Sequence, residues 1–152
     1  MKLLLPAELR ARIEGEARKA FPGECCGLIE GTRQGEVADA TALHPAGNIA
    51  VRADRFEIAP EDHFAALKAA RANGRDLIGC YHSHPGGRAI PSTTDLAGAS
   101  EDNFLWLIAG LGGAEAPMTL AAFVYSGAAF LPAELTLALG ADLVASSAKA
   151  RN

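Results

Sequence analysis

The sequence predicts an α/β fold of the α+β type, in which helices flank a mixed, mainly antiparallel β-sheet. Its length of 152 residues is that of one domain. Apolar residues make up 49% of the chain and charged residues 21%, a balance that supports a buried core and argues against disorder, collagen and coiled coil. Short apolar runs alternate with segments of helical periodicity, in the expected order β-α-β-β-α-β-α-β-β-β.

The first part of the chain predicts a strand, a helix and two more strands. The helix is expected over residues 7–21 and ends at Pro22-Gly23. Its apolar positions recur at helical spacing: Leu9, Ile13, Ala17 and Ala20. The apolar run 24–31 closes at a glycine and predicts a buried strand, and a further strand is expected over 36–43. Residues 44–48 are typical of a loop.

A second helix is expected over residues 60–73. Pro60 begins it, acidic residues occupy its first turn, and Asn73-Gly74 ends it. In this helix Phe64 and Leu67 are expected to face inward.

The next strand is expected over residues 77–84. Because side chains alternate along a strand, four of them should share one face: Ile78, Cys80, His82 and His84. A loop rich in Gly and Pro (85–91) leads to Ser92 and Asp95, which mark a helix start. Three further strands are expected over residues 104–109, 119–125 and 130–137.

These elements predict one domain over residues 1–138 and an Ala/Ser-rich helix or tail over 139–152. The net charge of −4 includes no basic block, so nucleic acid is not an expected partner. Three cysteines are too few for a disulfide scaffold and indicate free thiols in a reducing compartment. Neither a signal-peptide apolar region nor a run of about 20 apolar residues is apparent. We therefore expect a cytoplasmic protein without membrane contact; its oligomeric state stays open.

The most informative stretch is His82-Ser83-His84-Pro85 with the carboxylate of Asp95 eleven residues further on. Two histidines at i and i+2 on a strand can turn both imidazoles toward one ion, and Asp95 adds an oxygen. Three protein ligands and an open fourth position are typical of catalytic zinc. Such a site needs a base. Glu24 is the leading candidate, and Glu30 is the competing acid at the far end of the same strand.

These residues resemble the signature of the JAMM/MPN+ zinc metalloproteases, in their compact bacterial form. The matching stretches are PGECCGL (residues 22–28) and HSHPGGRAIPSTTD (residues 82–95), and the resemblance spans roughly residues 1–138. It implies a cytidine-deaminase-like MPN/JAMM fold with one Zn²⁺ per chain on His82, His84 and Asp95. Glu24 matches the family's general base, and Ser92 matches the residue that stabilises the oxyanion.

The resemblance also implies a reaction and a substrate class. Members of the family cleave a peptide or isopeptide bond after the C-terminal glycine of ubiquitin or a ubiquitin-like protein. Bacterial relatives act on sulfur-carrier proteins that end in Gly-Gly. Only Gly110–Pro117 separates two strands where eukaryotic deubiquitinases carry an insertion. A small carrier protein is therefore the expected substrate rather than ubiquitin itself.

Simpler interpretations stand beside these roles. Ser92 and Asp95 also form the sequence of a capping box, and Ser92 could serve both purposes. Three cysteines are most simply small buried hydrophobes, although Cys80 could touch the site: Cys25, Cys26 and Cys80. His44 and His63 are expected to face solvent. Asn48, in the loop after His44-Pro45, could lie near the substrate path, but a turn residue is the simpler interpretation.

Two other function classes compete with the metallopeptidase. A non-catalytic MPN-type binding scaffold is the main alternative, and the complete ligand set argues against it. A zinc nucleoside deaminase would need H-x-E and P-C-x-x-C, which this chain lacks.

Overall fold

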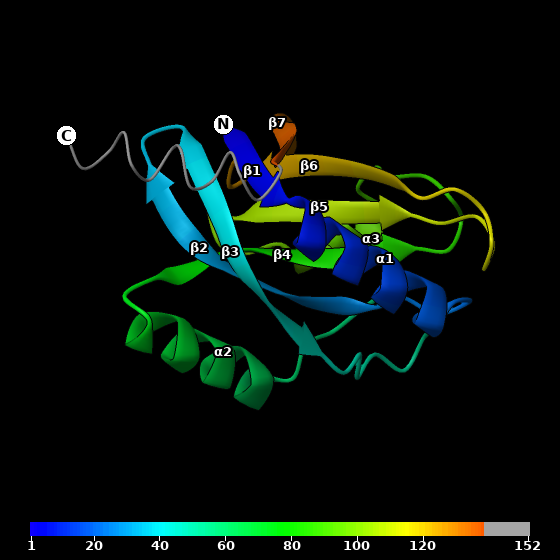
Figure 1. Ribbon diagram of the computed structural model, residues 1–152. Coiled ribbons are helices and arrows are strands. Elements are labelled where there is room, and N and C mark those ends of the chain that lie inside the picture. Colours follow the sequence, from blue (N-terminus) through cyan, green and yellow to red (C-terminus); the bar gives the residue numbers. More distant parts are fainter. Residues whose placement is uncertain (139–152) are drawn as a thin grey trace.

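The computed structural model describes residues 1–138, and the predicted tail at 139–152 lies outside the described residues. None of the helices in this part of the chain is long and apolar enough to cross a membrane. The order of elements is the expected one (Figure 1). The elements are β1 (Lys2–Pro6), α1 (Ala7–Ala20), β2 (Cys26–Gln34), β3 (Val37–Ala46), α2 (Pro60–Ala72), β4 (Asp76–His84), α3 (Thr93–Gly98), β5 (Leu105–Gly110), β6 (Thr119–Tyr125) and β7 (Phe130–Ala138).

The strands form one mixed sheet in the order β1-β3-β2-β4-β5-β6-β7, which closes into a barrel. Three of its pairings are parallel (β1·β3, β1·β7 and β4·β5) and four are antiparallel. This confirms the predicted mixed, mainly antiparallel sheet with flanking helices. Closure was not predicted: it arises because β1 pairs with β3 on one side and with β7 on the other.

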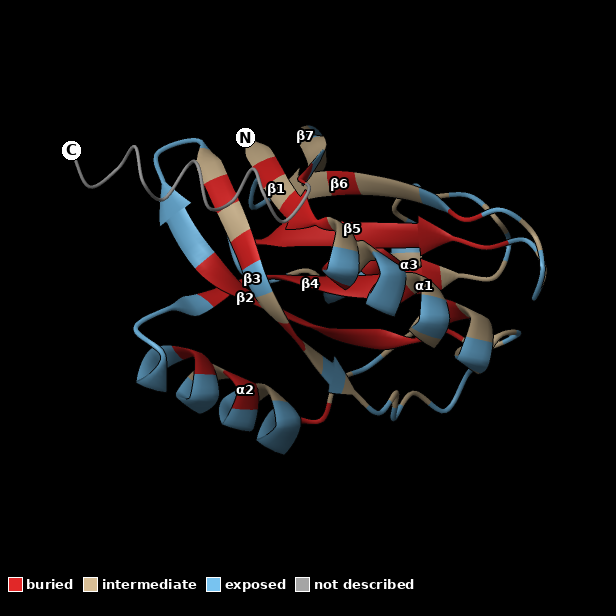
Figure 2. Cartoon of the chain, viewed as in Figure 1, coloured by how far each residue is buried: buried red, intermediate tan, exposed pale blue. Residues whose placement is uncertain are grey.

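Two hydrophobic cores lie on opposite faces of the sheet. On one face, α1 packs with its predicted apolar positions Leu9, Ile13 and Ala17 against strand residues such as Ile29 and Leu107. On the other face, a second core forms beneath α2. Figure 2 shows the central strands β4 and β5 buried along their length and the outer side of α2 exposed. Burial on both faces explains why these two parallel strands have nearly continuous apolar sequences.

The side of α2 that faces the sheet differs from the prediction. Ala66 and Ala70 are its buried residues, and Leu67 packs partly against the same core. Phe64, which was expected to face inward, is 68% exposed, so that prediction was wrong. Because the buried side chains are alanines four residues apart, the backbone of α2 can approach the sheet closely. The larger ring of Phe64 then points away from the interface.

Strand β4 departs from simple alternation at Ile78. Its register with β2 shifts between Ile29 and Glu30, since Ile29 pairs with Gly79 and Glu30 with Leu77. Ile78 therefore packs in the core under α1, whereas Cys80 packs in the core under α2. The prediction that both residues share the histidine face was wrong for Ile78, because a β-bulge inserts one unpaired residue and re-aims the side chain.

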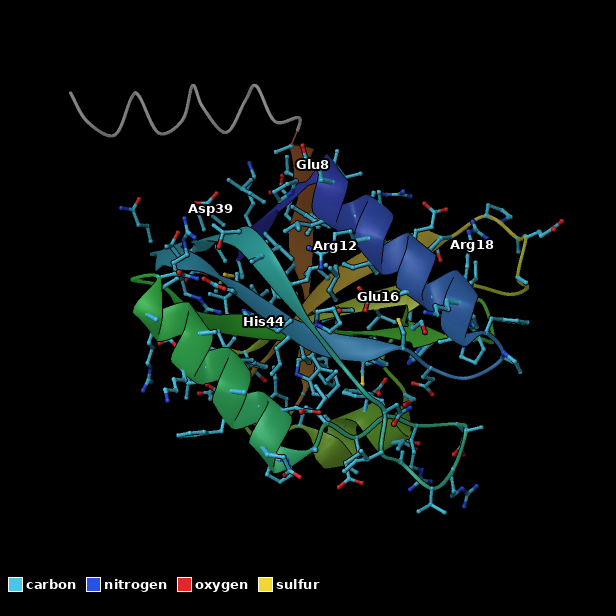
Figure 3. All side chains as sticks on the ribbon, turned by 60° about the horizontal axis from the view of Figure 1, so that its bottom comes forward. Glu8, Arg12, Glu16, Arg18, Asp39 and His44 are labelled. Atoms are coloured by element: carbon cyan, nitrogen blue, oxygen red, sulfur yellow. The ribbon has the colours of Figure 1, made fainter. Side chains whose placement is uncertain are left out.

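A close approach between β2 and β4 yields a stability prediction. Tyr81 is fully buried, and its hydroxyl donates to the Glu16 carboxylate at 2.7 Å. Glu16 lies on α1 and is labelled in Figure 3. A Cβ at Gly27 would overlap the Tyr81 ring. We expect Gly27→Ala to lower the free energy of unfolding by about 1–3 kcal/mol, through overpacking. Thermal denaturation checks this value.

The matched control for Gly27→Ala is Gly15→Ala. Gly15 lies on the exposed side of α1, and a Cβ there meets no atom within 4 Å. This exchange should raise the free energy of unfolding by about 0.5–1 kcal/mol, because alanine loses less backbone entropy in a helix. Equal stabilities for the two variants would contradict the proposed clash.

Candidate metal centre

The C-terminal end of β4 brings two imidazole rings together. His82 and His84 project to the same side of the strand, and their Nε2 atoms lie 2.9 Å apart. Asp95 reaches both rings from α3. Its Oδ1 lies 3.1 Å from Nε2 of His82, and its Oδ2 lies 3.1 Å from Nε2 of His84. The three residues predicted as ligands are thus in mutual contact, although they come from two separate elements.

A capping box fixes the carboxylate of Asp95. Ser92 is the N-cap of α3, and its hydroxyl accepts a hydrogen bond from the Asp95 backbone N–H at 3.0 Å. In return, the Ser92 backbone N–H donates to Oδ2 of Asp95 at 2.8 Å. Both partners of the predicted box are present. One carboxylate oxygen therefore holds the start of the helix and faces His84 at the same time.

Glu24 lies beside the two imidazoles, directly before the start of β2. Ligand atoms of Glu24, His82 and His84 all lie within 4.8 Å of one another. The side chain is buried, and its Oε1 has no hydrogen-bond partner among the described residues. Burial raises the pKa of Glu24 to about 7, and the positive charge of His84 opposes the rise. A carboxyl group with this pKa can take up and release a proton near neutral pH.

This raised pKa predicts a pH dependence in the metal-free protein. The folded-state pKa of Glu24 lies above the unfolded value of 4.5, so the folded protein favours the protonated carboxyl group. The resulting contribution to the free energy of unfolding is fully present below pH 4.5. That contribution is lost as the pH rises through 7. Carboxyl-labelled NMR should show one glutamate titrating near pH 7, absent from Glu24→Gln. A titration at the ordinary glutamate value would contradict the desolvated environment.

Charge states within the cluster favour a cation at its centre. Burial alone would raise the pKa of Asp95, but hydrogen bonds from His82 and His84 hold that pKa well below its usual range. Burial lowers the pKa of His82. Burial also opposes the charged form of His84, but the hydrogen bond and negative charge of Asp95, together with the Arg88 carbonyl and the charge of Glu24, raise the His84 pKa. An ionised carboxylate thus stands between two imidazoles, one of which favours the neutral form.

The donor set fits a divalent metal such as zinc. Imidazole nitrogens and a carboxylate oxygen are usual zinc ligands, and three protein ligands leave a fourth position for a reactant. The two Nε2 atoms lie 2.9 Å apart and face the same position, so in the tautomers whose Nε2 carries no proton both rings can offer a lone pair to a cation there. Oε1 of Glu24, which has no hydrogen-bond partner in the described part of the chain, adds a further polar atom next to this position.

Several residues that support the cluster were not singled out as functional from the sequence. Ser83, between the histidines, is buried, and its hydroxyl accepts from the Cys25 N–H at 2.8 Å, which ties the Glu24 segment to β4. Phe56 and Trp106 pack against the ring of His82. Alternation along β4 places Ser83 on the face opposite the histidines, and Phe56 lies in a loop without a recognisable signal.

The competing acid, Glu30, has a structural environment. It is 1% exposed, and its carboxylate contacts His44 Nε2 at 2.8 Å and accepts from the Asn73 amide at 3.1 Å. Figure 3 shows His44 on β3, alongside β2. These contacts connect β2 to β3 and to the end of α2, away from the histidine pair. Glu24 is therefore the acid that the fold brings to the cluster.

The cysteines behave as buried hydrophobes. All three are free and buried: Cys25, Cys26 and Cys80. Burial raises the pKa of Cys26 to about 12 and raises the pKa of Cys80 well above its usual value. Both thiols therefore stay protonated near neutral pH, which makes them poor metal ligands.

A cavity of about 540 Å³ adjoins the cluster on the side of Asp95. Its lining includes Phe56 and Trp106, which also contact His82, and His63 from α2. The predicted solvent-facing position of His63 is thus only partly correct, because its side chain is half-buried at this cavity.

Comparison with known proteins agrees with this geometry. The family model for prokaryotic homologs of the JAB domain matches residues 6–124. A desampylase of Haloferax volcanii is 35% identical over 112 residues, which cover 70% of this chain and 79% of that protein. A Thermus thermophilus protein named "Probable TtuB-protein conjugate cleaving protease" is 38% identical over 95 residues, covering 62% of this chain and 61% of its own.

A solved structure extends the likeness to the whole fold. The solution structure of a protein from Desulfitobacterium hafniense superposes with a TM-score of 0.78 and 27% identity, covering 93% of this chain and 97% of that one. Together with the two relatives named for conjugate cleavage or desampylation, these matches confirm the expectation of a JAMM-type isopeptidase. The chain belongs to the prokaryotic homologs of the JAB domain, the compact prokaryotic branch of the JAMM/MPN family.

Proposed function

We propose that the protein is a zinc-dependent hydrolase that cleaves a peptide or isopeptide bond after the C-terminal glycine of a ubiquitin-like or sulfur-carrier protein. One observation carries the proposal: two imidazoles and a carboxylate converge at the end of β4 beside a buried glutamate whose Oε1 accepts no hydrogen bond from residues 1–138. Three ligands with an adjacent acid are what metal-assisted hydrolysis needs, whereas a scaffold has no need of a desolvated Glu24.

In this proposal His82, His84 and Asp95 hold one Zn²⁺ per chain. The metal, when bound, would polarise the scissile carbonyl and lower the pKa of water at the open position. The capping box contributes orientation, because Asp95 keeps its carboxylate fixed by the Ser92 N–H at 2.8 Å. The backbone carbonyl of Arg88 lies 3.0 Å from Nδ1 of His84 and fixes the ring so that Nε2 faces inward.

Glu24 is the proposed general base and acid. Its carboxyl group, whose pKa in the metal-free protein is raised to about 7, is buried beside the proposed ligands and is placed to accept the proton of the attacking water and to pass it to the leaving amine. Ser92 is the proposed oxyanion donor. Its hydroxyl oxygen accepts from the Asp95 N–H, which leaves its own O–H free to donate to the developing charge.

The substrate class follows from the relatives and from the size of the domain. The two relatives are named for desampylation and for cleaving TtuB-protein conjugates, which supports a small ubiquitin-like or sulfur-carrier protein. A Gly-Gly tail suits the reaction because glycine lets the backbone approach a narrow site closely. The short connection between β5 and β6, at residues 111–118, favours such a partner over ubiquitin. We place the reaction in the cytoplasm, within one domain over residues 1–138.

The direct test is cleavage of a defined conjugate. A sulfur-carrier protein joined through its Gly-Gly end to a reporter should be cut by the zinc-loaded protein, and mass spectrometry should find the carrier product ending in Gly-Gly. A chelator should stop the reaction, and added zinc should restore it. Intact conjugate with the zinc-loaded protein, across several carriers, would instead favour the scaffold alternative.

A further inference from the structure

The orientation of His82 is not set by a hydrogen bond on its outer nitrogen. Its ring is fully buried, and Nδ1 has no hydrogen-bond partner among the described residues. A metal-binding histidine usually donates this second N–H to a carboxylate or carbonyl, as His84 can do toward the Arg88 carbonyl at 3.0 Å. His82 must therefore be held in another way.

Two aromatic rings pack against the His82 imidazole and fix its orientation. The ring of Phe56 stacks on the imidazole of His82, with centroids 4.3 Å apart and an interplanar angle of 25°. Trp106 meets the same imidazole edge-on at 5.7 Å and 89°. Phe56 and Trp106 also contact each other at 5.7 Å. Trp106 lies on the buried strand β5, whereas Phe56 lies in a loop, so the packing around His82 depends on where this loop holds the Phe56 ring.

Phe56 lies in the β3–α2 loop, residues 47–59, which has little regular structure of its own. The two ends of this loop are joined by an isolated β-bridge between Asn48 and Ile58 and by a hydrogen bond from the Ile49 N–H to the Glu57 carbonyl at 3.0 Å. These contacts join only the ends of the loop. Further hydrogen bonds beside Phe56 are needed to keep its ring stacked on His82.

The side chain of Asn48 supplies these hydrogen bonds and connects the loop to Glu24. Its Nδ2 donates to the backbone carbonyls of Glu24 at 3.2 Å and Arg55 at 3.0 Å. Its Oδ1 accepts from the N–H groups of Ala50 and Glu57, both at 3.0 Å. All four hydrogen-bonding positions of the amide are used. One side chain thus joins the residue before Phe56, the residue after it, and the main chain of the proposed base.

We propose that Asn48 is a positioning residue of the metal centre, whose amide locks Phe56 onto His82 and holds the main chain of Glu24 beside it. The inference rests on the proposed metal site. Asn48 touches none of the reacting groups itself; it acts through Phe56 and Glu24. Its pattern of two donors and two acceptors can be met by asparagine but not by aspartate, which has the same shape and no N–H.

The test uses two variants of the full chain. Asn48→Asp keeps the shape and removes both donors, so that a carboxylate faces the Glu24 and Arg55 carbonyls. Phe56→Leu keeps the Asn48 hydrogen bonds and removes the stacked ring. In the metal-free protein, NMR of labelled histidine should show the His82 ring resonances moving in the same direction in both variants, because the ring current of Phe56 is displaced or lost. Competition with a chelator should show zinc binding weakened roughly tenfold or more.

Matched controls separate this effect from a general loss of stability. Asn103→Asp makes the same exchange at an exposed turn, and Phe64→Leu makes the same exchange on the outer side of α2. Neither should change the His82 resonances or the zinc affinity. If Asn48→Asp does not fold, Asn48→Ala removes the same bonds without adding a charge and takes its place.

Wild-type resonances and zinc affinity in the Asn48 variant would overturn the proposal. An unchanged Phe56→Leu variant would equally overturn it, since the amide would then not act through the ring. These readouts are independent of the proposed reaction. A wild-type protein that binds zinc but cleaves no carrier conjugate would defeat the proposed function and leave the role of Asn48 intact.

Discussion

Glu24→Gln should lose hydrolysis and keep its zinc. Glutamine has the shape of glutamate, so the buried position beside His82 and His84 can accommodate it. Its amide cannot accept the proton of water, and the loss of general-base catalysis should lower kcat roughly 100- to 10,000-fold. His82, His84 and Asp95 are unaltered, so elemental mass spectrometry should still find one zinc per chain. Cleavage of a Gly-Gly-linked carrier conjugate measures the rate.

Glu115→Gln is the matched control for this experiment, since Glu115 is exposed in the connection between β5 and β6. It should retain both zinc and activity. Wild-type cleavage by Glu24→Gln would remove Glu24 from the mechanism. Loss of zinc in Glu24→Gln would make Glu24 a metal ligand and not the general base. Its carboxylate is close enough for this role, since ligand atoms of Glu24, His82 and His84 lie within 4.8 Å of one another.

His82→Ala should lose both zinc and hydrolysis. This exchange removes one of three ligands and opens a gap between Phe56 and Trp106, which both pack against the imidazole. Since a site with two remaining ligands binds zinc poorly, the metal content should fall from one per chain to none after dialysis. Activity on the carrier conjugate should fall with it. Thermal denaturation of the metal-free variant shows whether the fold survives.

His63→Ala is the control for zinc content. His63 lies on α2 and lines the neighbouring cavity without joining the cluster, so its removal should leave one zinc per chain. Full zinc occupancy in His82→Ala would show that the metal is held elsewhere, and the ligand assignment would have to be replaced. A variant of normal stability that lacks zinc gives the clearest support.

The sequence predicts the parts of this fold that depend on local pattern. The periodicity of α1 placed Leu9, Ile13 and Ala17 correctly in the core, since a helix side is defined by spacing alone. The buried face of α2 was predicted wrongly. Alanines form this contact because the helix lies close to the sheet, and that distance cannot be seen in the sequence. The bulge at Ile78 is also invisible in the sequence, since it depends on how β4 is paired with β2.

A similar division applies to the candidate site. The spacing of His82 and His84 on a strand, followed by Asp95, was enough to predict residues that the fold does bring into contact. The environment around them was not predictable in the same way. Asn48 has the ordinary sequence context of a turn residue, and its four hydrogen bonds reach main-chain groups brought close by folding.

The closure of the barrel has a consequence for how the chain acquires its structure. Residues Lys2–Pro6 of β1 pair with Glu134–Ala138 of β7, so the last contact of the ring joins opposite ends of the described chain. During synthesis β1 must remain without this neighbour until β7 has emerged, and contacts so distant in sequence form slowly. Until then β1 and β6 each keep the edge that β7 will cover exposed for pairing with other chains. Retarding release of the nascent chain after β6 should therefore increase aggregation rather than yield a stable partial barrel.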